Sequence, residues 1–278
     1  MHARSALFDL YGDHLLSRGG QAPVAALVRL LAPLRISGPA VRTAVSRMAR
    51  QGWLAPVRLP AGPGYQLTPR GERRMRQAAD RVYHHAPPAW DRRWHVVIVQ
   101  RVPERARRDR LRSALGFLGY ACLDGTTWIS PRPSAELGSL LASERIGAEQ
   151  FVAAYDGDAA QLVARAWDID GLGGAYTRWL AMARELTGQA TRWAGSDATG
   201  STGRVDPDPG WPDERVFAIR SELVHEWRKF LFVDPGLPAE LLPPHWPGAV
   251  AAEFFDASAA RLLPAAARFV DHCLGGAR

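Results

Sequence analysis

The sequence predicts a multidomain α+β protein, because three differently patterned stretches follow one another along its 278 residues. The first shows short amphipathic helices followed by a Pro- and Gly-rich hairpin, the middle opens on the apolar strand WHVVIV, and the last is again helical. A chain of this length can hold two or three hydrophobic cores. We expect domains over 1–86, 87–190 and 215–278, with a linker over 191–214 that is rich in Gly, Ser, Thr, Asp and Pro.

The first domain is predicted to begin with two helices, over residues 5–17 and 23–32. Apolar residues recur at helical spacing in both, and Pro33 ends the second. A short link, 34–36, then leads to a third helix. Two helices, a tight link and a further helix in this order predict a helix-turn-helix.

The third helix, 37–52, has marked ends and two faces of opposite character. Ser37 is a candidate N-cap, Pro39 suits the first turn, and Gly52 suits a left-handed stop. The polar face has no acidic residue and consists of Arg42, Thr43, Ser46, Arg47 and Arg50. Such a face suits a DNA major groove, where arginine contacts guanine edges and phosphates. The alternative is an ordinary basic surface helix.

A hairpin is predicted next, with strands at 53–59 and 65–68 around the turn 60–64. Arg58 lies where a phosphate contact is expected, and a basic helix, 69–84, follows. Three helices, a hairpin and a helix in this order predict a winged helix. The expected DNA contacts are Ser37, Arg42, Thr43, Ser46, Arg47, Arg50, Arg58 and Tyr65.

The positive charge of the chain is concentrated in this first domain. The formal net charge is +7, but residues 1–95 hold 15 arginines against 5 acidic residues. Residues 96–200 hold 12 basic and 12 acidic residues, and 201–278 hold 8 and 11. A polyanion such as operator DNA is therefore expected to bind the first third of the chain.

The central stretch predicts a ferredoxin-like domain. A buried strand at 94–99 precedes a helix at 104–118 and two strands at 121–123 and 126–129. The helices expected after these elements are 159–167, 171–188, 215–232 and 248–274, the last of them broken near Pro264.

Several motifs resemble those of PaaX-type transcriptional regulators. They are LFDLYGDHLL, RTAVSRM followed by GWL, YQLTPRG, WISPRP, AWDIDGLGGAY and FLFVDPGLPAELLPPHWPG. The resemblance covers nearly the whole chain. It implies a winged helix, a central domain similar to small CRISPR-associated ribonucleases, and a helical C-terminal domain. It also implies a repressor of phenylacetate or related aromatic catabolism that phenylacetyl-CoA releases from DNA.

An aryl-CoA effector requires an apolar slot for its acyl group and cations for its phosphates. The C-terminal domain supplies both, and the residues expected to bind the effector are Arg220, Trp227, Arg228, Lys229 and Trp246. The simpler alternative is that these aromatic residues form a core and these cations balance acids on a solvated helix face. A homodimer is also expected, because one helix reads only a few base pairs and specificity then needs two half-sites.

Catalytic chemistry, a cofactor and a bound metal are not expected. The sequence has no phosphate-binding Walker loop, and its 2 cysteines match neither a disulfide framework nor a zinc pattern. In the central domain Gln100 and Arg101 follow the first strand, so a divalent cation lacks a carboxylate ligand there. The alternative is a metal-dependent nuclease, or another nucleic-acid enzyme, built on this domain.

Two groups of titratable residues are expected to be structural. Asp9, Asp13 and His14 lie together on the first helix, and His225 lies beside Glu222 and Glu226 in a predicted surface charge network. The chain shows no signal-peptide core and no apolar run of membrane-spanning length, which favours a cytoplasmic location.

Overall fold

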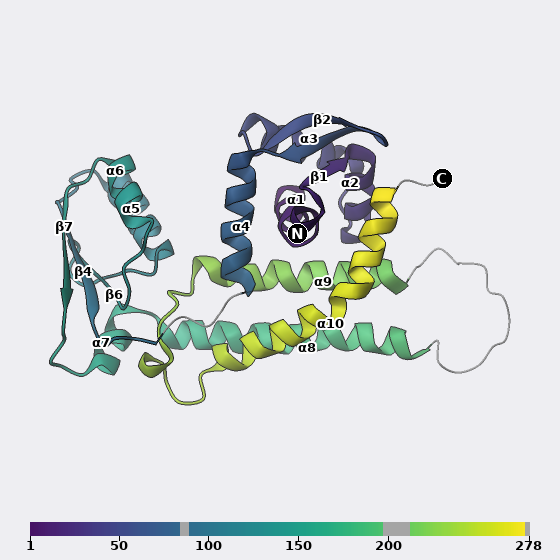
Figure 1. Ribbon diagram of the computed structural model, residues 1–278. Coiled ribbons are helices and arrows are strands. Elements are labelled where there is room, and N and C mark those ends of the chain that lie inside the picture. Colours follow the sequence, from purple (N-terminus) through teal and green to yellow (C-terminus); the bar gives the residue numbers. More distant parts are fainter. Residues whose placement is uncertain (84–88, 197–211, 276–278) are drawn as a thin grey trace. The chain divides into compact units, whose positions relative to one another are not determined.

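Figure 1 shows the computed structural model, which describes residues 1–83, 89–196 and 212–275. The chain divides into two compact units, and each takes residues from separate parts of the sequence. Unit 1 comprises Met1–His84, Trp179–Arg228 and Ala252–Arg278, and unit 2 comprises His85–Arg178 and Lys229–Ala251. Helices and two antiparallel sheets build the units, so the predicted mixed α+β class is confirmed.

Unit 1 opens with helices that change type along their length. α1 (Ala3–Leu10) continues into a π-helical turn, η1 (Tyr11–Leu15), and a 3₁₀ turn, η2 (Leu16–Arg18), before Gly19 turns the chain at a φ of 82°. The elements that follow are β1 (Gln21–Pro23), α2 (Val24–Leu31), the 3₁₀ turn η3 (Ala32–Leu34), α3 (Gly38–Arg50), β2 (Leu54–Leu59), β3 (Gly62–Leu67) and α4 (Pro69–Tyr83). The helices predicted in this region are thus present, with bounds shifted by a few residues.

The sheet of unit 1 has the strand order β1-β3-β2, and both pairs are antiparallel. β2 and β3 form the predicted hairpin, but β3 begins at Gly62 rather than at the predicted residue 65. The reason is that Gly62, Pro63 and Gly64, which are predicted to form the turn, pair with β2. A Cβ at Gly64 would lie 2.5 Å from the carbonyl oxygen of Ala22, so only glycine allows β1 to approach this closely. The sequence does not reveal β1, because a strand this short carries no periodic signal.

Three long helices complete the chain, and two of them contribute to both units. They are α8 (Ile169–Ser196), α9 (Pro212–Arg228) and α10 (Pro247–Gly275). The stretch 191–214 that is expected to be a linker is helical at both ends, because α8 continues to Ser196 and α9 begins at Pro212. Residues 197–211 lie outside the described residues.

The break expected near Pro264 does not occur. α10 runs through Pro264 without interruption, and the Pro264 side chain is exposed. Leu262 and Ala266 on either side of it are buried, at 4% and 0% exposure. Packing of the apolar face therefore holds the helix together although proline removes one backbone hydrogen bond.

One hydrophobic core joins the N-terminal helices of unit 1 to its C-terminal helices. Leu7 of α1, Leu27 of α2 and Met48 of α3 are fully buried in it. Phe217 of α9 and Phe269 of α10 belong to the same cluster. α1 packs against both α3 and α9, as Figure 1 shows. Burial of each such side chain stabilises by about 1.5–3 kcal/mol, so these helices form a single packed body.

Unit 2 contains a four-stranded antiparallel sheet of order β5-β6-β4-β7. Its elements are β4 (Trp94–Val99), α5 (Arg105–Phe117), β5 (Ala121–Cys122), β6 (Thr127–Ser130), α6 (Leu137–Glu144), β7 (Ala148–Ala153) and α7 (Ala159–Ala166). The strands and helix predicted between 94 and 129 are present. Neither α6 nor β7 is predicted from the sequence, and β7 gives no strand pattern because most of its residues are exposed and show no alternation.

Each face of this sheet has its own core. Val97, Leu115 and Leu141 belong to the cluster that includes α5 and α6, whereas Trp94 and Leu162 belong to the cluster that includes α7. This alternation explains why β4 is apolar apart from His95, since most of both its faces is covered; Ile98, near its end, is exposed.

The Pro-rich segment 229–251 packs against the start of α8 within unit 2. It contains two 3₁₀ turns, η4 (Lys229–Phe232) and η5 (Ala239–Leu241). Tyr176 stacks on Phe230 with ring centroids 4.0 Å apart, and its hydroxyl donates a hydrogen bond to Asp234. Both contacts hold the FLFVDP segment against the helix.

Candidate nucleic-acid interface

α3 is fixed in unit 1 by its apolar face. Val41 and Met48 have no exposed surface, and Val45 is 1% exposed. Ser37 occupies the N-cap position with extended backbone, and its carbonyl accepts the first helical bond from Val41. Its side chain makes no capping hydrogen bond, so the predicted capping role of the Ser37 hydroxyl is wrong, and this exposed hydroxyl has no partner within the described residues.

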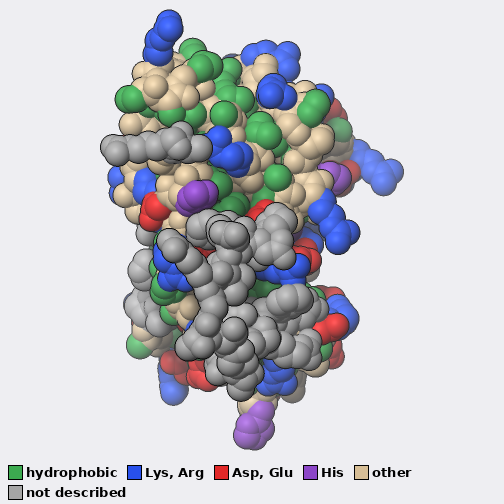
Figure 2. Space-filling view, turned by 90° about the vertical axis from the view of Figure 1, so that its right-hand side faces the viewer, with side chains coloured by type: hydrophobic (Ala, Val, Ile, Leu, Met, Phe, Trp, Pro, Cys, Tyr) green, Lys and Arg blue, Asp and Glu red, His purple; other side chains and the backbone are tan. Residues whose placement is uncertain are grey.

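The polar face of α3 is exposed along the whole helix. Its exposed residues are Arg42, Thr43, Ser46, Arg47 and Arg50. Among the described residues, none of the three arginines forms an ion pair or a hydrogen bond with another side chain, and α3 itself contains no acid. Figure 2 shows basic side chains projecting at the upper end of the molecule, the end where Figure 1 places α3 and the β2–β3 hairpin. The surface therefore presents uncompensated guanidinium groups to solvent.

On the hairpin next to α3, the side chain of Arg58 is exposed, whereas that of Tyr65 is half-buried. Arg58 is exposed on β2 opposite Pro63, near the hairpin turn. Tyr65 of β3 is half-buried and packs against the core, and its carbonyl accepts a hydrogen bond of 3.1 Å from the Tyr11 hydroxyl. Tyr65 thus links β3 to the end of α1, whereas Arg58 is free to contact a ligand.

A buried carboxylate of α1 connects this helix to α9. The Asp9 side chain is 5% exposed and lies 2.8 Å from Nδ1 of His225 and 2.7 Å from Nε of Arg228. The Arg228 guanidinium also lies over the Phe8 ring, 4.6 Å from its centroid. His225 therefore pairs with Asp9, a residue far away in sequence, rather than only with Glu222 and Glu226 as the predicted surface network required.

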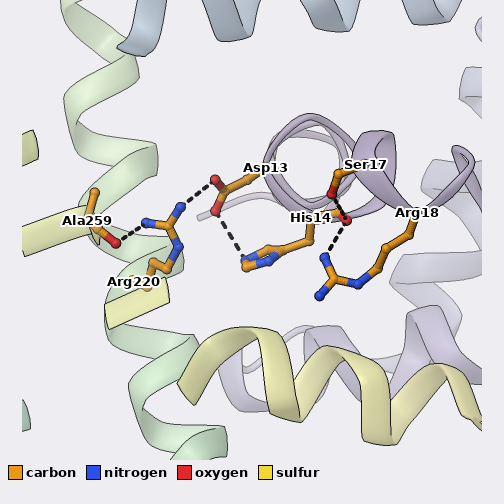
Figure 3. A network of polar contacts seen from close by, with 6 residues as sticks. All are labelled: Asp13, His14, Ser17, Arg18, Arg220 and Ala259. Carbon is orange, nitrogen blue, oxygen red and sulfur yellow. Dashed lines mark hydrogen bonds and ion pairs between the residues drawn. The ribbon is translucent and has the colours of Figure 1, made fainter. Parts of the chain in front are cut away.

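A second buried carboxylate, one helical turn further on, makes a parallel connection (Figure 3). Asp13 accepts a hydrogen bond of 2.7 Å from Arg220 of α9, and its other oxygen lies 3.1 Å from Nε2 of His14. Arg220 also donates to the carbonyl of Ala259 in α10, at 2.9 Å. Arg18, 2.7 Å from Asp271 of α10, adds an exposed ion pair between the same parts of unit 1. The helices around α3 are thus tied to α9 and α10 by charges as well as by the core.

His14 is the most deeply buried titratable group of this network. It is 1% exposed, and burial lowers its pKa below the ordinary value of 6.5, with the neighbouring Arg220 and Arg18 acting in the same direction and Asp13 opposing them. Asp9, Asp13 and His14 are structural, as expected. Their partners on α9 are not predicted from the sequence, although two acids at i and i+4 on one helix indicate that cations lie opposite them.

The residues expected to bind an effector are divided between the two units. Arg220 and Trp227 are 3% and 4% exposed in unit 1, where Trp227 stacks on Phe255 at 4.8 Å and donates to the Val82 carbonyl. Arg228 also belongs to unit 1. Lys229 is exposed and Trp246 is half-buried against Tyr176, both in unit 2.

Within residues 1–83, 89–196 and 212–275, no three His, Cys, Asp or Glu side chains are grouped so that they could hold a metal ion. Of the helices that the structure describes, none combines the length and the apolar character needed to cross a bilayer.

Three family models match the chain. The model for PaaX-like proteins matches residues 2–71, that for the PaaX protein central Cas2-like domain matches 87–164, and that for the PaaX-like protein C-terminal domain matches 167–272. The Transcriptional repressor PaaX of Escherichia coli is 28% identical over 276 residues, which are 96% of this chain and 82% of that protein. Among solved structures, the uncharacterized protein Rv0674 of Mycobacterium tuberculosis is similar with a TM-score of 0.59 and 24% identity, covering 98% of each chain. That likeness supports the fold alone.

Proposed function

The chain belongs to the PaaX-like family, and we propose on this basis that it is a transcriptional repressor, not an enzyme, that binds operator DNA through α3. The observation that carries the proposal is the exposed, acid-free face of α3, whose arginines have no protein partner among the described residues. The predicted winged helix over 1–86, ferredoxin-like domain over 87–190 and helical domain over 215–278 are the proposed domain organisation.

The proposed readout divides the DNA contacts by position. Arg42 and Arg47, five residues apart on the polar face, enter the major groove with Thr43 and Ser46, while Ser37 and Arg50 at the helix ends reach phosphates. Arg58 on the hairpin contacts the backbone or the minor groove. Tyr65 supports β3 from within, since its ring packs against the core.

A small-molecule effector, proposed to be an aryl-CoA such as phenylacetyl-CoA, releases the protein from DNA, and the regulated genes are those of phenylacetate or related aromatic catabolism. The family membership supports this assignment. Arg220 and Trp227 are buried, so in this conformation their role is to hold α9 in unit 1. Lys229 is exposed and Trp246 is half-buried, and both stay proposed effector contacts, as does Arg228, which directly precedes Lys229.

The protein is further proposed to act in the cytoplasm as a homodimer on a near-palindromic site. A helix of this size reads only a few base pairs, and two half-sites about 10 bp or a multiple apart supply the specificity that one lacks. Light scattering on the free protein and on its DNA complex measures the stoichiometry, and a monomer in both would contradict the dimer.

Selection of duplexes from a random pool tests the main proposal. Repeated binding by the purified chain should enrich one motif, and footprinting should then protect that motif. The same protein incubated with Mg²⁺ or Mn²⁺ and labelled DNA and RNA should leave both intact. A pool that stays random would reject sequence-specific binding, and metal-dependent cleavage that survives Arg42→Ala would favour the nuclease alternative.

A further inference from the structure

The surface charge of unit 2 is segregated. Residues 101–112, which lead into α5 and form much of it, hold 6 arginines and 2 acidic residues. The rest of the unit, 85–100, 113–178 and 229–251, holds 7 basic and 11 acidic residues. α5 therefore presents a basic surface on a unit that is otherwise acidic. The arginines of unit 2 are concentrated in this segment rather than distributed evenly.

Two of these arginines have structural roles. Arg107 donates hydrogen bonds to the backbone carbonyls of Glu144 and Arg145, at the end of α6. Arg108 donates to the carbonyl of Val102, at 3.0 Å, and to that of Pro103. These hydrogen bonds fix α5 against the end of α6 and the segment before α5.

The remaining four arginines extend into solvent. We call Arg101, Arg105, Arg110 and Arg112 the arginine face, and all four are exposed. The Arg105 side chain is 89% exposed, and its Nε atom lies 3.9 Å from a carboxylate oxygen of Asp109, one turn further along α5. Nowhere in the described part of the chain does Arg101, Arg110 or Arg112 have an ion pair or a hydrogen-bond partner. An ordinary solvated helix pairs such charges with acids at i+4, and of these four arginines Arg105 alone has an acid there.

The geometry of the helix spaces these charges at a useful distance. Leu111 and Leu115 bury one side of α5 in the core, which leaves Arg105 and Arg112 on the same solvent-facing side, two turns apart. Seven residues of an α-helix span about 10 Å, which is comparable with the ~12 Å width of a DNA major groove. Two guanidinium groups so spaced can reach phosphates on both sides of a groove.

We propose that the arginine face of α5 binds the phosphates of duplex DNA that extends beyond the site read by α3. The proposal rests on the proposed DNA-binding function and adds a second, sequence-independent contact in unit 2. Guanidinium groups bind phosphate by charge-assisted hydrogen bonds and release condensed counterions, so this contact adds affinity and salt dependence without adding specificity.

The double variant Arg105→Gln/Arg112→Gln tests the proposal. Its matched control is Arg165→Gln/Arg178→Gln, which removes the same charge from exposed positions on α7 and α8. Fluorescence anisotropy measures the Kd of each protein for the selected motif, as a minimal duplex and as a duplex extended by ~20 bp on each side, between about 50 and 200 mM salt.

The expected difference is confined to the extended duplex. Loss of two phosphate contacts lowers the slope of log K against log salt by about 1.8, so the wild type should lose roughly twelve-fold more affinity over this salt range than the α5 variant. The control should keep the wild-type slope. Equal slopes for the wild type and the α5 variant would overturn the proposal, as would an equal change in the control.

The outcome for α5 is separable from that for α3. The ratio of affinities for the selected motif and a scrambled duplex reports the proposed function, whereas the slope reports the arginine face. If the protein prefers the motif but the wild type and the α5 variant have the same salt slope, only the α5 contact is rejected. If the affinities for the motif and the scrambled duplex are equal but the α5 variant has a lower salt slope, only sequence-specific binding is rejected. If the α5 variant loses affinity for single-stranded RNA but not for extended duplex, an RNA surface replaces the proposed one.

Discussion

Asp13 of the π-helical turn accepts a 2.7 Å hydrogen bond from Arg220 of α9, and the two side chains are only 7% and 3% exposed. This pair joins a helix from the start of the chain to one from its last third, within one packed unit. Arg220 continues to Ala259 of α10, and Tyr11, in the same turn as Asp13, continues to Tyr65 of the hairpin. A contiguous set of contacts thus runs from α10 to the elements beside α3.

Removing one member of this pair should destabilise the protein strongly. Arg220→Met leaves Asp13 without its guanidinium partner in a buried site, and such changes typically cost about 3–5 kcal/mol. The double variant Asp13→Leu/Arg220→Met removes both charges and should recover much of that loss, because the desolvation cost disappears with them. Urea unfolding of the single and double variants gives the coupling free energy, and additive losses would contradict a buried pair.

His14 should make stability depend on pH near neutrality. Burial holds its folded pKa below the ordinary value of 6.5, so the neutral imidazole is favoured by folding. The unfolded chain then binds a proton more readily, and the free energy of unfolding should fall as the pH decreases from about 6.5 through the folded pKa. In His14→Gln this part of the pH dependence should be absent. Chemical unfolding at several pH values between 5 and 8 measures it. An identical profile for the variant and the wild type would show that other groups are responsible.

The sequence predicts the helices and strands of unit 1 better than it predicts the contacts between them. The α3 helix, its two faces and the hairpin follow from local spacing, and the exposure of Arg42 and Arg47 agrees with that pattern. The pairing of Asp9 with His225 and Arg228 joins residues more than two hundred positions apart, and no local pattern specifies such a contact. The same limit explains why Arg220 and Trp227 resemble ligand-binding residues in the sequence but are buried in the fold.

Replacing Pro264 should make the protein more stable. It lies in the interior of α10 with an exposed side chain, and proline there removes a backbone hydrogen bond. Pro264→Ala restores the donor and a favourable helix former, so the midpoint of thermal unfolding should rise, by an amount equivalent to ~1 kcal/mol or more. Leu263→Ala, at the neighbouring exposed position, serves as a control and should change stability little. A lower melting temperature for Pro264→Ala would mean that α10 needs the local geometry that proline imposes.

The polar face of α3 should separate base readout from phosphate contact. Arg42→Ala and Arg47→Ala each remove an exposed guanidinium without touching the buried face of Val41, Val45 and Met48, so the fold should be retained. Loss of a base-reading arginine should cost about 1–3 kcal/mol on the selected motif and relax the sequence preference of the protein.

Arg58→Ala on the hairpin should instead weaken binding to all duplexes alike and lower the slope of log K against log salt by about 0.9. Arg165→Ala, exposed on α7, is the control and should leave both quantities unchanged. Anisotropy titrations on the motif and on single-base variants of it distinguish the two effects. Undiminished affinity of both Arg42→Ala and Arg47→Ala would assign the recognition surface to another element.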